Sequence, residues 1–131
     1  MVVELTSGVT ATLLEEAARA HPLECCGLLL GQGERVETAQ PAANVHPDPH
    51  SHFEIDPAAL IAAHRLARSG GPQVLGYYHS HPNGLTRPSP TDQSQASGDG
   101  RIWAIVAAVE VSWWLDTPCG FEALPTRVAP G

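Results

Sequence analysis

The chain of 131 residues contains no lysine, and all seven of its basic residues are arginine. Aspartate and glutamate together number 14, so the formal net charge at pH 7 is −7. A protein that binds nucleic acid needs clustered cations that displace counterions from the phosphates. The charge balance therefore excludes a nucleic-acid partner, and it favours a protein partner that presents a basic face.

Long hydrophobic runs are also missing from the sequence. The longest apolar stretch covers residues 102–109, whereas a helix that spans a bilayer needs roughly 20 apolar residues. The first residues carry neither the basic segment nor the apolar core of a secretory signal. These absences predict a cytoplasmic protein that does not bind to or span a membrane.

Cysteine is scarce, with only Cys25, Cys26 and Cys119. The odd number and the adjacent pair exclude a disulfide framework, and the absence of a Cys-x-x-Cys sequence argues against a thiolate zinc site. We therefore expect Cys25 and Cys26 to be buried thiols.

Three helices are predicted from apolar spacing and capping residues. The first begins at a Ser7 or Thr10 N-cap and ends before Pro22. The second covers residues 56–68, where an acidic cap precedes a proline in the first turn. The third starts within residues 89–92, which read Ser-Pro-Thr-Asp.

Apolar runs bounded by turn residues predict the strands, and a segment rich in proline, asparagine and histidine at residues 41–52 predicts a loop. Because helices and strands alternate along the chain, the expected fold class is α/β (α+β), with one domain over residues 1–131 and a mixed sheet flanked by helices. The predicted strands cover residues 2–5, 25–30, 35–39, 74–78, 102–108, 111–115 and 121–124.

The sequence His79-Ser80-His81 follows the predicted strand 74–78. Side chains at positions i and i+2 of a strand point to the same face, so both imidazoles can reach one metal ion. Asp92 arrives from the first turn of the next helix. Two histidines and one carboxylate leave one position of a tetrahedral Zn²⁺ site open, which is typical of a catalytic site. Ser80 should face the opposite side, so it has no predicted ligand role.

Two simpler explanations compete with parts of this interpretation. Residues 89–92 are also an ordinary helix cap, with Ser89 as N-cap and Asp92 as the third helical residue; the two roles are compatible, since a cap fixes the carboxylate. A second His-Ser-His sequence at residues 50–52 lacks the downstream serine and aspartate. We interpret it as loop that lines a substrate groove.

Further stretches accompany the histidine motif. Residues 21–31 read His-Pro-Leu-Glu-Cys-Cys-Gly-Leu-Leu-Leu-Gly, and Asn44, Phe53 and Asp56-Pro57 follow. Together with His79-Ser80-His81-Pro82, Ser89 and Asp92, they resemble the JAMM (MPN+) zinc metallopeptidases of the compact bacterial type, over residues 9–114. The resemblance implies the JAMM/MPN fold, which is similar to that of cytidine deaminases, with a curved mixed sheet and two main helices.

The resemblance also implies roles for five residues. His79, His81 and Asp92 would bind one zinc ion per chain, Glu24 would hydrogen-bond the water that is the fourth ligand, and Ser89 would help to stabilise the oxyanion. The chemistry of amide hydrolysis agrees, because it needs a carboxylate that carries a proton and has a raised pKa. Glu24 precedes an apolar strand, where desolvation raises a carboxyl pKa. Ser89 as a covalent nucleophile ranks below its role at the oxyanion.

By resemblance, we expect a zinc metallopeptidase that cleaves the bond after the C-terminal Gly-Gly tail of a ubiquitin-like sulfur-carrier protein. A general isopeptidase that removes ubiquitin-like modifiers is the alternative enzyme. A metal-free MPN scaffold or protein-interaction module is the non-enzymatic alternative. Zinc-dependent nucleobase deamination is excluded, because the chain has no Pro-Cys-x-x-Cys sequence to complete such a zinc site.

Overall fold

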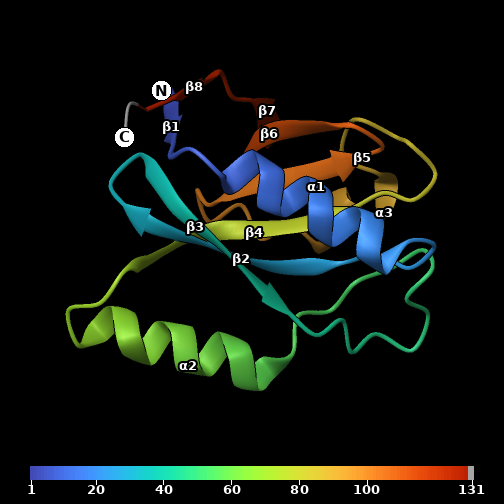
Figure 1. The fold of residues 1–131 in the computed structure, drawn as a ribbon, viewed down its shortest axis with the longest axis horizontal. Coiled ribbons are helices and arrows are strands. Elements are labelled where there is room, and N and C mark those ends of the chain that lie inside the picture. Colours follow the sequence, from blue (N-terminus) through green and yellow to red (C-terminus); the bar gives the residue numbers. More distant parts are fainter. Residues whose placement is uncertain (130–131) are drawn as a thin grey trace.

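An eight-stranded mixed sheet carries the three helices of the described chain (Figure 1). The computed structural model describes residues 1–129; residues 130 and 131, at the end of the predicted domain, lie outside the described residues. In chain order the elements are β1 (Val3–Leu5), α1 (Val9–Ala20), β2 (Cys26–Gln32), β3 (Arg35–Ala42), α2 (Pro57–Arg68), β4 (Gln73–Ser80), α3 (Pro90–Gln95), β5 (Ile102–Ala107), β6 (Glu110–Thr117), β7 (Gly120–Ala123) and β8 (Thr126–Val128).

The strands lie in the order β7-β6-β5-β4-β2-β3-β1-β8. β4 pairs in parallel with β5, and β1 pairs in parallel with both β3 and β8, whereas the remaining pairs are antiparallel. The sheet is therefore mixed, as predicted, and it curls around α1 (Figure 1). The connection between the parallel strands β4 and β5 contains α3, so this helix lies near the end of β4.

The two longer helices cover opposite faces of the sheet. Leu29 of β2 packs on the α1 side with Leu13, whereas Leu28 and Leu30 pack on the α2 side with Ala63. Successive side chains of a strand point to opposite faces, so a strand covered on both sides must be apolar throughout. This explains the nearly continuous apolar run in β2. Cys26 is buried in the same strand, and burial raises the pKa of its thiol to about 12.

The cap of α1 differs from the prediction. Gly8 is the N-cap, and no side chain caps the helix, so neither Ser7 nor Thr10 has that role. Residue 8 has φ 98°, a left-handed conformation that glycine adopts without a steric cost. The prediction for α2 is confirmed: Asp56 is its N-cap and accepts a hydrogen bond from the N–H of Ala58, and Pro57 is its first residue.

The seven predicted strands are present, with ends that shift by up to three residues, and β8 was not predicted. β3 continues through Pro41, which the prediction had placed in a loop. Pro41 pairs with Gly27 of β2, whereas β1 pairs on the other side only with Arg35 and Val36. Pro41 therefore lies where β3 is an edge strand, and an edge tolerates a residue without an N–H.

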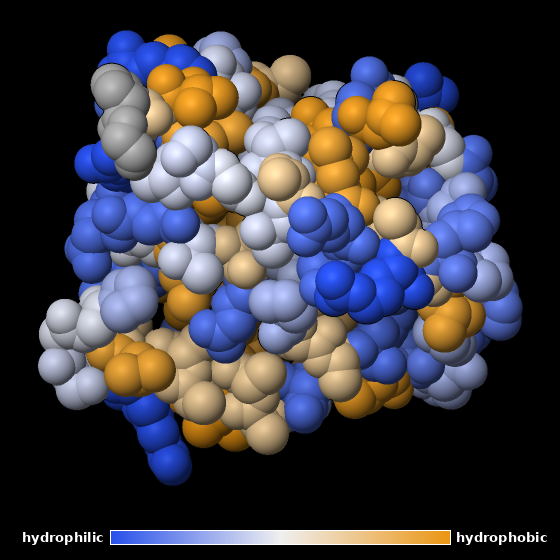
Figure 2. Space-filling model, in the orientation of Figure 1, coloured by the Kyte–Doolittle hydropathy of each residue, from blue (hydrophilic) through white to orange (hydrophobic). Residues whose placement is uncertain are grey.

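The surface shows no dominant apolar face in the view of Figure 2, where hydrophobic residues form several small groups separated by hydrophilic ones. Isolated apolar residues on a surface are ordinary and indicate no binding site by themselves. Among residues 1–129, no helix has the length and hydrophobicity needed to cross a membrane.

Candidate metal centre

The two histidines of the motif lie where β4 ends. His79 belongs to β4, and the N–H of His81 donates to the carbonyl of Val106 on β5 (2.8 Å), so the strand-like course continues past Ser80. The hydroxyl of Ser80 accepts a hydrogen bond from the N–H of Cys25 (2.8 Å) and is buried. Ser80 therefore serves the link between β4 and the start of β2, and the two imidazoles share the other face.

Asp92 reaches the same point from α3. Ser89 is the N-cap of this helix; its hydroxyl accepts from the N–H of Asp92 (3.0 Å), and the Asp92 carboxylate accepts from the N–H of Ser89 (2.9 Å). This reciprocal pair is a capping box, which fixes the third residue of a helix relative to its N-cap. The predicted cap is confirmed, and it holds the carboxylate in a defined orientation.

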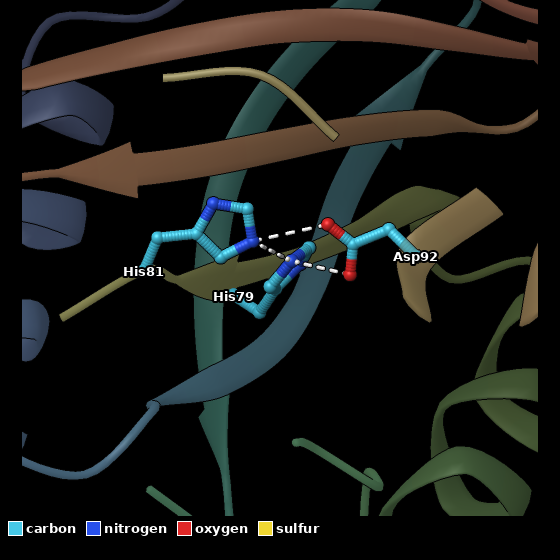
Figure 3. Close-up of side chains that lie close together, drawn as sticks. All are labelled: His79, His81 and Asp92. Carbon is cyan, nitrogen blue, oxygen red and sulfur yellow. Dashed lines mark hydrogen bonds and ion pairs between the residues drawn. The ribbon is translucent and has the colours of Figure 1, made fainter. Parts of the chain in front are cut away.

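The three side chains converge on one another (Figure 3). The Nε2 atoms of His79 and His81 are 3.1 Å apart. His79 Nε2 lies 3.1 Å from Asp92 Oδ1, and His81 Nε2 lies 3.0 Å from Asp92 Oδ2. All three residues are buried, with at most 6% of each exposed. Two regular elements, β4 and α3, thus bring two nitrogen donors and one oxygen donor to one position.

Different contacts orient the two imidazoles. His81 Nδ1 donates to the carbonyl of Leu85 (2.8 Å), so the other nitrogen of a neutral ring has a free lone pair. The ring of His79 stacks on Phe53, with centroids 4.2 Å apart, and Trp103 meets it edge-on at 5.7 Å. Within residues 1–129, His79 Nδ1 has no hydrogen-bond partner. Apart from the contacts of its Nε2 atom with Asp92 and His81, only packing holds the His79 ring within residues 1–129.

The electrostatics of His79 and Asp92 favour the protonation states that a metal ion needs, whereas those of His81 favour the charged ring. Burial holds the pKa of His79 below its ordinary value, so the ring is neutral. Burial alone would raise the pKa of Asp92, but hydrogen bonds with His79 and His81 outweigh it and lower the pKa well below its usual range. For His81, burial lowers the pKa, but the hydrogen bonds with Asp92 and the Leu85 carbonyl, together with the nearby negative charges, outweigh it and raise the pKa. Asp92 is thus ionised, and its charge favours a cation between the three groups.

This set of donors fits a divalent metal ion. His79, His81 and Asp92 are the one group of metal-ligating side chains that the structure brings together in residues 1–129. Zn–N bonds of about 2.0–2.1 Å place the ligands of a tetrahedral site roughly 3.3 Å apart, close to the separations found. The three residues could therefore hold a metal ion and leave a fourth position open.

Glu24 and Ser89 line a cavity of about 320 Å³ beside His81. Glu24 is only 7% exposed, and burial raises the pKa of its carboxyl group to about 7. The expected effect of desolvation is confirmed. Of the second His-Ser-His sequence, which was predicted to line a substrate groove, His50 and Ser51 line this cavity, whereas His52 stacks on His46. All five predicted site residues lie at or beside one cavity.

Three residues that shape the site had no predicted role. Phe53 packs on His79, and Leu85 receives the hydrogen bond of His81. Asn44 donates to the carbonyl of Glu24 (3.0 Å). Asn44 and Phe53 were noticed only as parts of the family resemblance, and nothing in the local sequence links them to residues 24 or 79. Such contacts arise from the tertiary fold.

Residues 6–116 match the protein family Prok-JAB, the prokaryotic homologs of the JAB domain. This span contains every residue of the site. The chain belongs to this family. A desampylase of Haloferax volcanii is 37% identical over 93 residues, which cover 70% of this chain and 67% of the relative. A probable TtuB-protein conjugate cleaving protease of Thermus thermophilus is 44% identical over 89 residues. That match covers 64% of this chain and 59% of the relative, so it spans less than two thirds of the Thermus protein.

Solved structures share the fold of this JAB-domain protein. A Desulfitobacterium hafniense protein superposes with a TM-score of 0.85 and 29% identity, over 99% of this chain and 94% of that one. A JAMM structure described as a metalloprotease-like zinc site in the proteasome and signalosome gives a TM-score of 0.60 with 21% identity, over 97% of this chain and 99% of that one. At that identity the likeness shows the fold alone, and the expected JAMM/MPN fold is confirmed.

Proposed function

We propose that this JAB-domain protein is a zinc-dependent hydrolase that cleaves the peptide or isopeptide bond after the C-terminal Gly-Gly tail of a ubiquitin-like sulfur-carrier protein. In this proposal residues 1–131 act as one catalytic domain. One observation carries it: two buried histidines and an ionised aspartate converge beside a cavity that also contains a carboxyl of raised pKa.

His79, His81 and Asp92 would hold one zinc ion in each chain. When bound, zinc supplies a water of lowered pKa and polarises the substrate carbonyl. Glu24 accepts the proton of the attacking water and returns it to the leaving nitrogen, a task that suits a pKa near 7. The Ser89 hydroxyl accepts the N–H of Asp92, so its own hydrogen is free to donate to the carbonyl oxygen.

The names of the relatives support a ubiquitin-like partner. One is a desampylase, and the other is named for cleaving TtuB-protein conjugates. An extended Gly-Gly tail suits a narrow cleft, because it can pair through its main chain and needs no room for side chains. A general isopeptidase for ubiquitin-like modifiers has the same chemistry and a different leaving group. A metal-free scaffold is disfavoured, since all three donor positions are filled.

The test is incubation of the zinc-loaded protein with ubiquitin-like sulfur carriers that bear an extension after Gly-Gly, followed by intact-mass measurement. We expect cleavage directly after the second glycine and about one zinc per chain by elemental analysis. Glu24→Gln should keep the zinc and lose hydrolysis by on the order of 10²–10⁴-fold. Full hydrolysis by Glu24→Gln would contradict the proposed mechanism, and conjugates cleaved in preference to extended carriers would favour the general isopeptidase.

A further inference from the structure

The main chain of Glu24 is held on both sides by one loop. This loop, residues 43–56, connects β3 to α2 and is called the Asn44 loop below. The N–H of Glu24 donates to the carbonyl of Pro49 (2.8 Å), and the carbonyl of Glu24 accepts from Asn44 Nδ2 (3.0 Å). Both main-chain polar groups of Glu24 therefore bond to the Asn44 loop rather than to the sheet.

Asn44 also joins the loop to itself. Its Nδ2 donates a second hydrogen bond, to the carbonyl of His52 (3.0 Å), and its Oδ1 accepts from the N–H groups of His46 (3.1 Å) and Glu54 (3.0 Å). An asparagine side chain offers two donors and two acceptor sites, so Asn44 uses its full capacity. The donor half reaches Glu24 and His52, whereas the acceptor half binds only within the loop.

The carboxylate of Glu24 has no comparable support. Within residues 1–129, no side chain or N–H group donates a hydrogen bond to it, although it faces the cavity beside His81. The next residue, Cys25, is fixed to β4 through Ser80. The orientation of the carboxylate therefore depends on the main chain of Glu24, which lies between the fixed end of β4 and the Asn44 loop.

We propose that Asn44 is a positioning residue that fixes the main chain of Glu24 and thereby aims its carboxylate at the candidate metal centre. This inference rests on the proposed function, in which Glu24 carries the proton. A displacement of about 1 Å in a catalytic group can cost on the order of 10²-fold in rate. Asn44 touches neither the metal ligands nor the cavity beside His81, so its effect must pass through the groups it bonds. These are Glu24 and, on the other side, His52 and Glu54, which flank the Phe53 that packs on His79. The double-mutant cycle below separates the two routes.

Two substitutions separate the two halves of the Asn44 side chain. Asn44→Ala removes all four hydrogen bonds. Asn44→Asp keeps the two acceptor bonds to His46 and Glu54 and removes the two donated ones, including the bond to Glu24. Asp56→Ala is the matched control, because it removes the N-cap of α2 at the end of the same loop without touching Glu24. All variants are measured with the extended carrier used above, at a temperature where each is folded.

We expect both Asn44 variants to lower kcat by roughly 10–100-fold with little change in KM, and Asp56→Ala to leave both unchanged. In a double-mutant cycle, Asn44→Ala should cause little further loss in the Glu24→Gln protein, because two residues that act through one group are not additive. An equal loss in both backgrounds, or a change in KM alone, would overturn the inference.

A measurement without activity keeps the test independent of the proposed function. The Glu24 carboxyl carbon can be titrated by NMR in the zinc-free protein. Release of its main chain should let water reach the carboxyl group, so Asn44→Ala should move the midpoint from near 7 toward the ordinary value of 4.5. An unchanged midpoint in Asn44→Ala would reject the positioning role. If Glu24→Gln hydrolyses normally, the mechanism fails while this titration still decides the role of Asn44.

Discussion

The tripeptide His-Ser-His occurs twice in this chain, and the fold uses the two copies differently. At residues 79–81, both imidazoles are buried and their Nε2 atoms lie 3.1 Å apart beside Asp92. This copy lies at the end of the central strand β4 and faces the helix α3, which supplies the carboxylate. Its histidines therefore meet the donors that a metal site needs.

The copy at residues 50–52 lies in the Asn44 loop. His50 is exposed, and His52 stacks on His46 with ring centroids 4.6 Å apart. The nearest carboxylate oxygen to His52 Nδ1 belongs to Asp48, at 3.6 Å, and that side chain is 59% exposed. No third donor converges on this pair within residues 1–129. The difference shows that the spacing of two histidines does not make a metal site; the strand geometry and the distant carboxylate do.

The strongest test of this difference is to remove one histidine from each copy. His81→Ala should lose bound zinc and lower hydrolysis by on the order of 10³-fold or more, because a Lewis acid contributes several kcal/mol to such a reaction. His52→Ala should keep both the bound zinc and the rate of hydrolysis. Zinc content is measured by elemental analysis after loading and desalting. Equal zinc in the two variants would mean that the metal does not bind at residues 79–81.

The second prediction concerns the downstream serine that only the 79–81 copy possesses. Ser89→Ala should lower kcat by about 10²–10³-fold through loss of a donor to the oxyanion. It should also cost about 1 kcal/mol of unfolding free energy through loss of the α3 cap. Asp56→Ala loses the α2 cap and should cost a similar free energy without a change in kcat. If Ser89→Ala also loses only stability and keeps its kcat, Ser89 is a cap and nothing more.

The third prediction uses the carboxyl group beside the buried copy. The pKa of Glu24 is raised to about 7, so the folded state holds a proton that the unfolded state releases above about pH 4.5. The stability of the zinc-free protein should therefore fall as the pH rises from 4.5 to 7. Glu24→Gln should stabilise it by about 2–3 kcal/mol at pH 8 and have no such effect at pH 4.

Chemical denaturation at both pH values measures this difference. Glu54→Gln is the matched control, since it removes an exposed carboxylate from the Asn44 loop and should change the unfolding free energy by less than about 0.5 kcal/mol at either pH. A Glu24→Gln effect of equal size at pH 4 and pH 8 would show that Glu24 does not hold the proton.

The smallest expected effect comes from the middle residue of each copy. Ser80→Ala leaves the buried N–H of Cys25 without a partner and should cost about 1–2 kcal/mol of unfolding free energy. Ser51 is exposed, and within residues 1–129 its hydroxyl bonds only to its neighbours Asp48 and His52. Ser51→Ala should therefore change the unfolding free energy by less than about 0.5 kcal/mol. Thermal unfolding of the two variants, side by side, checks the ranking.

Local rules made much of the fold predictable. Strand alternation placed His79 and His81 on one face, and the sequence Ser-Pro-Thr-Asp placed Asp92 in the first turn of a helix. These features depend on residues a few positions apart. One error has a local cause, since a glycine with positive φ replaced the side-chain cap of α1. The other depends on strand pairing, since Pro41 continued β3 where that strand is an edge.

Contacts between distant residues were not predictable in the same way. The stacking of Phe53 on His79 joins residues 26 positions apart, and Asn44 reaches Glu24 across 20 positions. Glu24 itself was singled out only through the family resemblance, since its raised pKa depends on burial that β2 and the Asn44 loop create together. A side chain's solvent exposure is a property of the packed molecule.

By itself, the sequence determined the identity of the donors, the elements that carry them and the family to which the chain belongs. Strand period and helix capping are short-range effects, so they can be read from neighbouring residues. The tertiary structure decided how closely His79, His81 and Asp92 converge and how Glu24 is held. Those outcomes depend on which strands pair and where a loop folds back, and both are settled by the burial of apolar surface across the whole chain.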